Sequence, residues 1–237
     1  MAALAVALWR AMPRSRPSTS LRYGALLASI GALIRREPVL RRRMLFGACG
    51  YAGFSLVCTT LTFLLSDPPF DFGESTIGLF GLAGLGGAVA AMRMGRLHDR
   101  GYGRIATGAV LAAILLSWPI LCPGRESVPA ILLGLVLLDF GVQGQNFLSQ
   151  GAIYALGRET TGRVTTAYVT SNFSGGAIGS AAGAIAWSAG GWLPVCAVGF
   201  CFAATALLAW LTEPRPRPRR RGRRGPLATV ARVALDQ

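Results

Sequence analysis

The sequence predicts an all-α membrane protein whose six transmembrane helices form a 3+3 inverted-repeat bundle. Apolar blocks are the first indication: 52% of the 237 residues are hydrophobic and 14% are charged, whereas soluble domains carry about a quarter charged residues. Arginines confined to alternate loops are the second. The third is a faint repeat among six long apolar blocks, numbered in chain order. The first and fourth blocks (44–65 and 128–150) carry polar residues, the second and fifth (75–94 and 164–188) are rich in glycine, and the third and sixth (105–122 and 192–211) are apolar. Three helices are an odd number, so such a repeat must invert across the membrane.

Residues 1–43 are expected to precede the transmembrane domain. Residues 1–9 are apolar but too short for a span, which needs about 20 residues. No basic segment precedes them, so they are not expected to be a signal peptide, and we interpret them as the stump of an earlier helix. Residues 21–37 carry an apolar stripe at helical spacing between arginines. This pattern predicts an amphipathic helix at the membrane surface within a cytoplasmic loop; a soluble linker helix is the alternative.

Residues 44–211 form the predicted six-helix transmembrane domain. Its apolar blocks approach or exceed the length that a bilayer requires. Ser127 is a suitable N-cap, and Pro129 and Pro194 fall in expected first turns, where proline is tolerated. Residues 212–237 follow as a basic, disordered tail. The expected spans are 44–65, 75–94, 105–122, 128–150, 164–188 and 192–211.

The arginines predict the orientation. If the first loop lies inside, the inside segments hold 23 of the 24 arginines. The outside loops then hold only Arg125, with four carboxylates at Asp67, Asp71, Glu74 and Glu126. Positive charge accumulates on the cytoplasmic side of membrane proteins. We therefore expect a multi-pass protein of the cell (plasma or inner) membrane with both termini in the cytoplasm.

The formal charge of +14 does not indicate nucleic-acid binding. Its arginines lie between apolar blocks and in the tail, where attraction to anionic lipid accounts for them. The five cysteines contain no CxxC pair, which favours small buried hydrophobes over metal ligands. His98 is the single histidine. No metal and no cofactor are expected.

The span 128–150 carries the strongest candidate site. Asp139, Gln143, Asn146 and Gln150 recur at intervals that place them on one helical stripe. Asp139 lies about 16 Å from the outer end of the span at 1.5 Å per residue. An ionised carboxylate at that depth costs at least about 2.5–3.5 kcal/mol, so it should face protein or water. The stripe predicts a substrate or proton cavity; a structural hydrogen bond to a neighbouring helix is the alternative.

Weaker polar signals lie on two other spans. Tyr51, Ser55 and Thr59 share a face of the span 44–65, although hydroxyls that bond their own backbone are common in membrane helices. Tyr168 and Asn172 of the span 164–188 are expected to join the same cavity.

The span 164–188 also carries Gly175, Gly179 and Gly183 at four-residue spacing. Small residues at this spacing let helix backbones approach closely. These glycines predict packing rather than chemistry.

The loop at residues 95–104 reads GRLHDRGYGR. It resembles the G-x-L-x-D-R-x-G-R signature that the major facilitator superfamily carries after the second helix of each half. The resemblance extends over residues 10–211, including the GLFGLAGLGGAVAA and SGGAIGSAAGAIAW segments. These segments look like the seventh to twelfth helices of that family. The resemblance implies an inner gate contact, broken as the two halves rock, formed by Gly95, Asp99, Arg100, Gly103 and Arg104.

The resemblance implies a secondary active transporter for a small solute, working by alternating access, with proton-coupled export as a candidate mode. The family has two halves and this chain resembles the C-terminal one, so a missing N-terminal half or a second copy is expected as partner. The alternative is a non-transporting membrane fragment or scaffold that needs a partner half. An intramembrane enzyme ranks last. No nucleophile elbow, zinc signature or phosphate loop occurs, and Asp139 is the only Asp, Glu or His clearly within a span.

Overall fold

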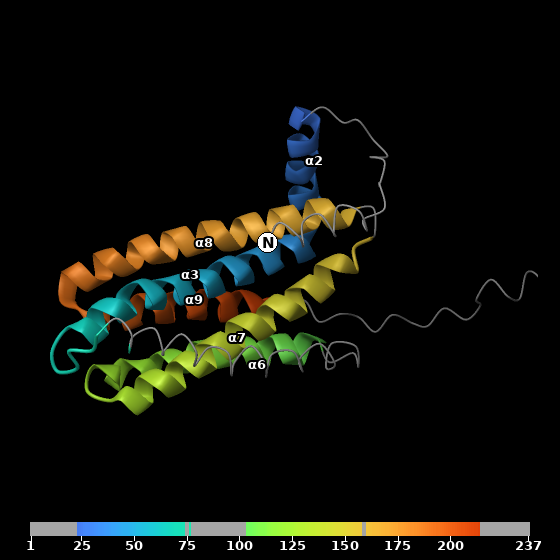
Figure 1. Ribbon diagram of the computed structural model, residues 1–237. Coiled ribbons are helices and arrows are strands. Elements are labelled where there is room, and N and C mark those ends of the chain that lie inside the picture. The colour runs from blue at the N-terminus through green and yellow to red at the C-terminus, as the bar shows by residue number, and fades with distance from the viewer. Residues whose placement is uncertain (1–22, 74–75, 77–102, 158–159, 214–237) are drawn as a thin grey trace, which may run out of the picture.

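The computed structural model describes residues 23–73, 76, 103–157 and 160–213, and this part of the chain is helical. The helices α3, α6, α7, α8 and α9 run side by side as a bundle, and α2 stands across its end (Figure 1). Their bounds are α2 Tyr23–Arg36, α3 Pro38–Ser66, α6 Gly103–Leu121, α7 Val128–Tyr154, α8 Thr161–Gly190 and α9 Trp192–Leu211, with a 3₁₀ turn, η2, at Cys122–Arg125.

Four of the described helical segments are long and apolar enough to cross a membrane: Pro38–Ser66, Gly103–Arg125, Val128–Tyr154 and Trp192–Leu211. Helix α8 has 30 residues but is not among them, because threonine, serine, asparagine and glycine dilute its apolar residues. The second expected span, 75–94, lies almost wholly outside the described residues. The all-helical membrane bundle is therefore confirmed, while the six-helix 3+3 arrangement stays a prediction.

Helix boundaries follow local signals. Helix α9 coincides with the expected 192–211. Helix α7 begins after Ser127 at the N-cap, with proline in its first turn as predicted, although the Ser127 side chain makes no capping hydrogen bond. Helix α3 begins at Pro38, six residues before the expected start, because proline there suits a first turn. The arginines of residues 41–43 are thus helical and not part of a loop.

The α3–α8 contact depends on glycine, as the four-residue spacing predicts. A Cβ added at Gly175 would overlap the backbone of Ala48, and one at Gly179 would overlap the backbone of Ala52. At Gly183 an added Cβ would lie 3.2 Å from the Leu56 carbonyl oxygen. The two backbones therefore approach more closely than any larger residue permits.

Trp118 fills the centre of the packing among α3, α6 and α9, with 1% of its surface exposed. A Cβ added at Gly199 of α9 would overlap its ring, and one at Gly53 of α3 would lie 3.2 Å from Cζ2. Large side chains thus enter notches left by glycines on neighbouring helices, which gives a dense interior.

Helix α2 lies within residues 21–37, where an amphipathic surface helix is expected. Its Ile30, Leu33 and Ile34 pack against the end of the bundle, where Leu40 and Val164 are buried. Leu27 is exposed. At least part of the apolar stripe of α2 therefore packs against the protein itself. Contact of α2 with a membrane surface stays a prediction.

Candidate functional site

The polar stripe of α7 faces α3. Asn146 Nδ2 donates to the Tyr51 hydroxyl of α3 at 3.4 Å, and Gln150 Nε2 donates to Asn146 Oδ1 at 3.2 Å. Gln143, Asn146 and Gln150 are half-buried. Asn146 and Gln150 of the predicted stripe thus form a hydrogen-bonded row that continues onto a second helix. Its amides and hydroxyl offer both donors and acceptors to a polar solute.

Asp139 is the buried acid of this row, with 7% of its surface exposed. It lies near enough to α3 for its charge to act on Tyr51 and on Cys58. A carboxyl group can accept a proton when it is charged and donate one when it is neutral. Asp139 is therefore the candidate proton carrier of α7.

Ser55 and Thr59 lie against α8 instead of α7. Thr59 Oγ1 donates to the Ser55 carbonyl oxygen at 2.9 Å and lies 2.8 Å from Ser180 Oγ. A Cβ added at Gly176 would lie 2.9 Å from Ser55 Oγ. These two hydroxyls thus join α3 to α8, and their place in a common cavity with Asp139 stays a prediction.

Asn172 belongs to a second buried polar cluster that sequence reasoning identified only in part. It lies on α8 one turn from Tyr168, whose hydroxyl is close to both Asn172 and Ser149 of α7, although the three groups are not aligned as regular hydrogen bonds. Gln145, one turn from Ser149, abuts Gly50 of α3. All four side chains are buried. The four-residue spacing of Gln145 and Ser149 was the available signal, but the pair lies about 110° around α7 from the stronger stripe.

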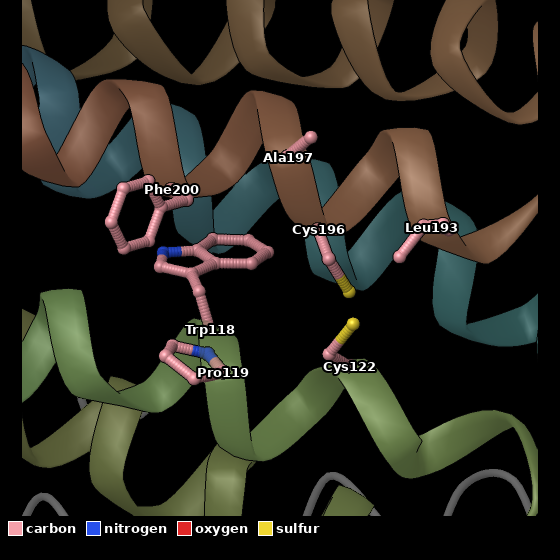
Figure 2. Close-up of a pocket in the computed structure, with 7 residues that line it drawn as sticks. All are labelled: Trp118, Pro119, Cys122, Leu193, Cys196, Ala197 and Phe200. Carbon is pink, nitrogen blue, oxygen red and sulfur yellow. The ribbon is translucent and has the colours of Figure 1, made fainter.

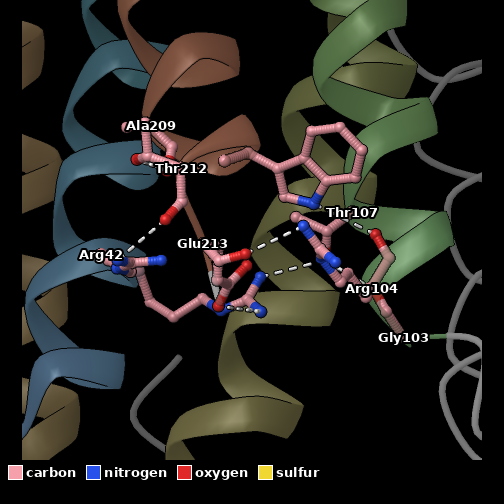
Figure 3. Close-up of polar contacts among 9 residues, drawn as sticks. Arg42, Gly103, Arg104, Thr107, Ala209, Thr212 and Glu213 are labelled. Carbon is pink, nitrogen blue, oxygen red and sulfur yellow. Dashed lines mark hydrogen bonds and ion pairs between the residues drawn. The ribbon is translucent and has the colours of Figure 1, made fainter. Parts of the chain in front are cut away.

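The gate loop is described only from Gly103 onward; Gly95, Asp99 and Arg100 lie outside the described residues. Gly103 and Arg104 begin α6. Arg104 Nη2 donates to the Glu213 carbonyl oxygen at 2.9 Å, and the Arg104 carbonyl accepts from Trp210 Nε1 at 3.2 Å. The Arg104 guanidinium also stacks over the Trp210 ring, 5.4 Å from its centroid. Arg104 therefore ties the start of α6 to the end of α9 (Figure 3).

Arg43 of α3 completes this cluster. Its Nη1 donates to Thr107 Oγ1 at 3.0 Å, and its Nη2 lies 3.8 Å from Glu213 Oε1. Arg42 Nη2 donates to the Thr212 carbonyl oxygen at 3.4 Å (Figure 3). Charged groups and one hydroxyl thus join the ends of α3, α6 and α9. We call these residues the arginine cluster: Arg42, Arg43, Arg104, Thr107 and Glu213. Sequence reasoning missed it because residues 41–43 looked like loop arginines.

The described part of the chain offers no set of side chains that could hold a metal ion. No three His, Cys, Asp or Glu side chains come together there. The site consists of one buried acid, a row of amides and hydroxyls, and the arginine cluster at one end of the bundle.

Comparison with known proteins decides the family. Residues 1–180 match the description of the Major Facilitator Superfamily, which is more than half of the chain. The chain belongs to the major facilitator superfamily. The resemblance stated on the loop motif is thereby confirmed, and so is a multi-pass membrane protein from a family of transporters.

Its relatives in the major facilitator superfamily are also named as transporters. The uncharacterized transporter YgaY of Escherichia coli O157:H7 is 41% identical over 210 residues, covering 89% of this chain and 53% of YgaY. A Streptomyces coelicolor protein named "Probable transporter SCO4007" is 32% identical over 195 residues, covering 80% of this chain and 44% of its own length. The chain therefore spans about half the length of the relatives it matches.

Proposed function

We propose that this chain is the C-terminal six-helix half of a secondary active transporter that exports a small solute by alternating access, coupled to protons. The observation that carries the proposal is the buried acid Asp139 beside the hydrogen-bonded row of Asn146, Gln150 and Tyr51. An acidic residue inside a transmembrane bundle is commonly part of a substrate or proton pathway. Protonation changes the charge of Asp139, so it can be linked to opening and closing of the cavity.

Each part of the row has a proposed role. Asp139 carries the coupling proton. Gln143, Asn146 and Gln150 donate and accept hydrogen bonds to the solute, and Tyr51 positions Asn146. Ser55, Thr59 and Asn172 contribute hydroxyl and amide groups when the helices around the cavity shift. The reaction is movement without covalent chemistry, in agreement with a family of transporters.

The arginine cluster is proposed to close the inner end together with the gate loop. In the structure, Arg43 and Arg104 of two helices both hold Glu213 at the end of a third. Gly95, Asp99, Arg100, Gly103 and Arg104 would act on the same side. Opening inward requires these contacts to part, while an outward-open state keeps them.

The proposed partner is a second six-helix unit, either an N-terminal half or a second copy of the chain. The chain matches about half the length of each of its relatives. In addition, the half-buried amides of α7 would face lipid if no partner covered them. Unpaired polar groups in lipid are costly. We place the assembly in the cell membrane with both termini in the cytoplasm, in contact with lipid and solute and not with nucleic acid.

The same half-length match favours a second candidate, a non-transporting membrane fragment or scaffold that binds a partner half. Solute flux into liposomes containing the purified chain, with its mass measured in detergent, separates the two. Transport by a dimer or by a reconstituted pair of halves is the expected result. Robust flux from a demonstrated monomer would contradict the need for a partner. Binding of a partner half without any flux, over a panel of solutes and pH gradients, would favour the scaffold.

A further inference from the structure

A hollow of about 190 Å³ lies between the end of α6 and the start of α9 (Figure 2). Two cysteines that are distant in sequence, Cys122 and Cys196, point their sulfur atoms toward each other across it. Both thiols are free in the structure and face each other across the hollow. The remaining lining is apolar: Trp118, Pro119, Leu193, Ala197 and Phe200.

Neighbouring contacts hold the two cysteines in register. Trp192, one turn before Cys196, donates its Nε1 proton to the carbonyl oxygen of Leu121, the residue before Cys122, at 2.8 Å. Both Trp192 and Leu121 are buried. On the other side of the pair, the ring of Trp118 fits against Gly199. Fixed contacts one turn away on both sides therefore hold the end of α6 and the start of α9 in register around the two cysteines.

We propose that Cys122 and Cys196 form a disulfide in the mature protein. The inference rests on the proposed orientation, which puts the η2 turn and the start of α9 at the outer face of the membrane. Outer compartments sustain disulfides, whereas the cytoplasm reduces them. A disulfide needs Cβ atoms about 3.5–4.5 Å apart, so a small shift of the η2 turn would set the Cβ spacing and side-chain rotation would bring the two sulfur atoms together.

The bond forms by two thiol–disulfide exchanges with a disulfide-carrying protein oxidant of the outer compartment. One cysteine thiolate attacks the disulfide of the oxidant, which breaks that S–S bond and gives a mixed disulfide. The second thiolate then attacks the sulfur of the first cysteine, which forms the Cys122–Cys196 bond and releases the oxidant as a dithiol. Two electrons pass to the oxidant, and the two thiol protons end on its sulfurs. A hollow of about 190 Å³ is too small to admit a protein oxidant, so the exchange takes place while the chain inserts into the membrane.

Thiol counting on the full chain, isolated from membranes, tests this proposal. Free thiols are blocked with N-ethylmaleimide in denaturant, the protein is then reduced, and newly exposed thiols are labelled and located by peptide mass spectrometry. We expect three of the five cysteines to be blocked and only Cys122 and Cys196 to be labelled. Labelling of no cysteine after reduction would overturn the proposal.

Matched variants sharpen the result. Cys122→Ser and Cys196→Ser should each abolish the masked pair and leave the other thiol free. Cys201→Ser, at an exposed position of the same helix α9, should leave the pair masked. A reporter fused after Arg125 separates two failures. If it reports the outside and all thiols are free, the disulfide proposal is wrong; if it reports the cytoplasm, the proposed orientation is wrong and the disulfide inference falls with it.

Discussion

Arg43 and Asp139 are both buried ionisable side chains, each with 7% of its surface exposed, but their surroundings differ. The guanidinium of Arg43 has a hydroxyl partner in Thr107 and a carboxylate partner in Glu213. Asp139 lies beside a row of neutral amides and a tyrosine. The first arrangement holds a fixed charge between two helices, whereas a carboxyl group can carry a proton, which is the role we propose for Asp139. We therefore expect Arg43 to determine stability and Asp139 to determine coupling.

Asp139→Asn should abolish proton-coupled transport in a complete, active protein while leaving its abundance in the membrane near normal. The amide keeps the size and polarity of the carboxyl group but cannot carry a proton. Uptake across a range of pH and quantitative blotting measure both effects. Asp71→Asn, the same change at an exposed loop position, should leave transport unaltered. Unchanged uptake by Asp139→Asn would remove Asp139 as the coupling acid, and loss of abundance alone would indicate a structural role.

Arg43→Met should destabilise the protein by up to about 3–5 kcal/mol, because removing one partner of a buried ion pair leaves the other uncompensated. Thermal unfolding in detergent, followed by size-exclusion chromatography, measures the shift in Tm. Arg41→Met is the matched control: Arg41 is exposed on the same turn of α3, and its loss should change stability by less than about 0.5 kcal/mol. Equal Tm values for the two variants would show that the arginine cluster contributes no stability.

The α7 stripe could be predicted from sequence because Asp139, Asn146 and Gln150 repeat at helical spacing within one apolar block. Arg43 could not, because its partner Glu213 lies at the far end of the chain and becomes a neighbour only through packing. Gln145 and Ser149 were missed for a related reason. Each looks like an isolated polar residue until α3 and α8 cover it. Local periodicity thus predicts a face, but it does not predict which helix that face meets.

At the level of helices, the contact between α3 and α8 is the most demanding feature of the bundle. It needs glycine at Gly175 and Gly179 because the backbone of α3 occupies the space of any side chain there. The four-residue spacing predicted a close backbone approach at these glycines, but it did not predict α3 as the partner helix. The earlier start of α3 was not predicted. The three arginines at 41–43 indicate where the apolar span begins, but they do not interrupt the helix.

Gly179→Ala should separate α3 from α8 and cost about 1–3 kcal/mol, as overpacking of a filled site commonly does. Gly162→Ala is the matched control in the same helix, since a Cβ there meets nothing within 4 Å. That change should be neutral or stabilising by up to about 1 kcal/mol, the difference in helix propensity. Thermal unfolding of both variants in detergent is the measurement. Tolerance of Gly179→Ala equal to that of Gly162→Ala would contradict the close approach.

For the whole molecule, orientation is the first property to establish, because the gate, the partner and the disulfide all depend on it. A reporter active only in the cytoplasm should be active when fused after Gln237 and silent when fused at Asp71. The reason is that 23 of the 24 arginines fall in the predicted inside segments. A fusion after Ser66 should match the one at Asp71, since α3 ends there. Swapped signals would refute the predicted orientation, and equal signals at Asp71 and Gln237 would refute the six-helix count.

The length of α3 has a mechanical consequence. Its 29 residues measure about 43 Å at 1.5 Å per residue, well beyond a hydrocarbon core of about 30 Å. Held at its outer end, such a rod acts as a lever. Arg43 lies roughly 35 Å from that fulcrum, so a swing of about 5° carries it sideways by about 3 Å. That displacement is comparable with the 3.8 Å that separates its guanidinium from Glu213. A tilt of α3 too small to disturb the packing near the fulcrum is therefore enough to break the Arg43–Glu213 contact at the opposite end of the bundle.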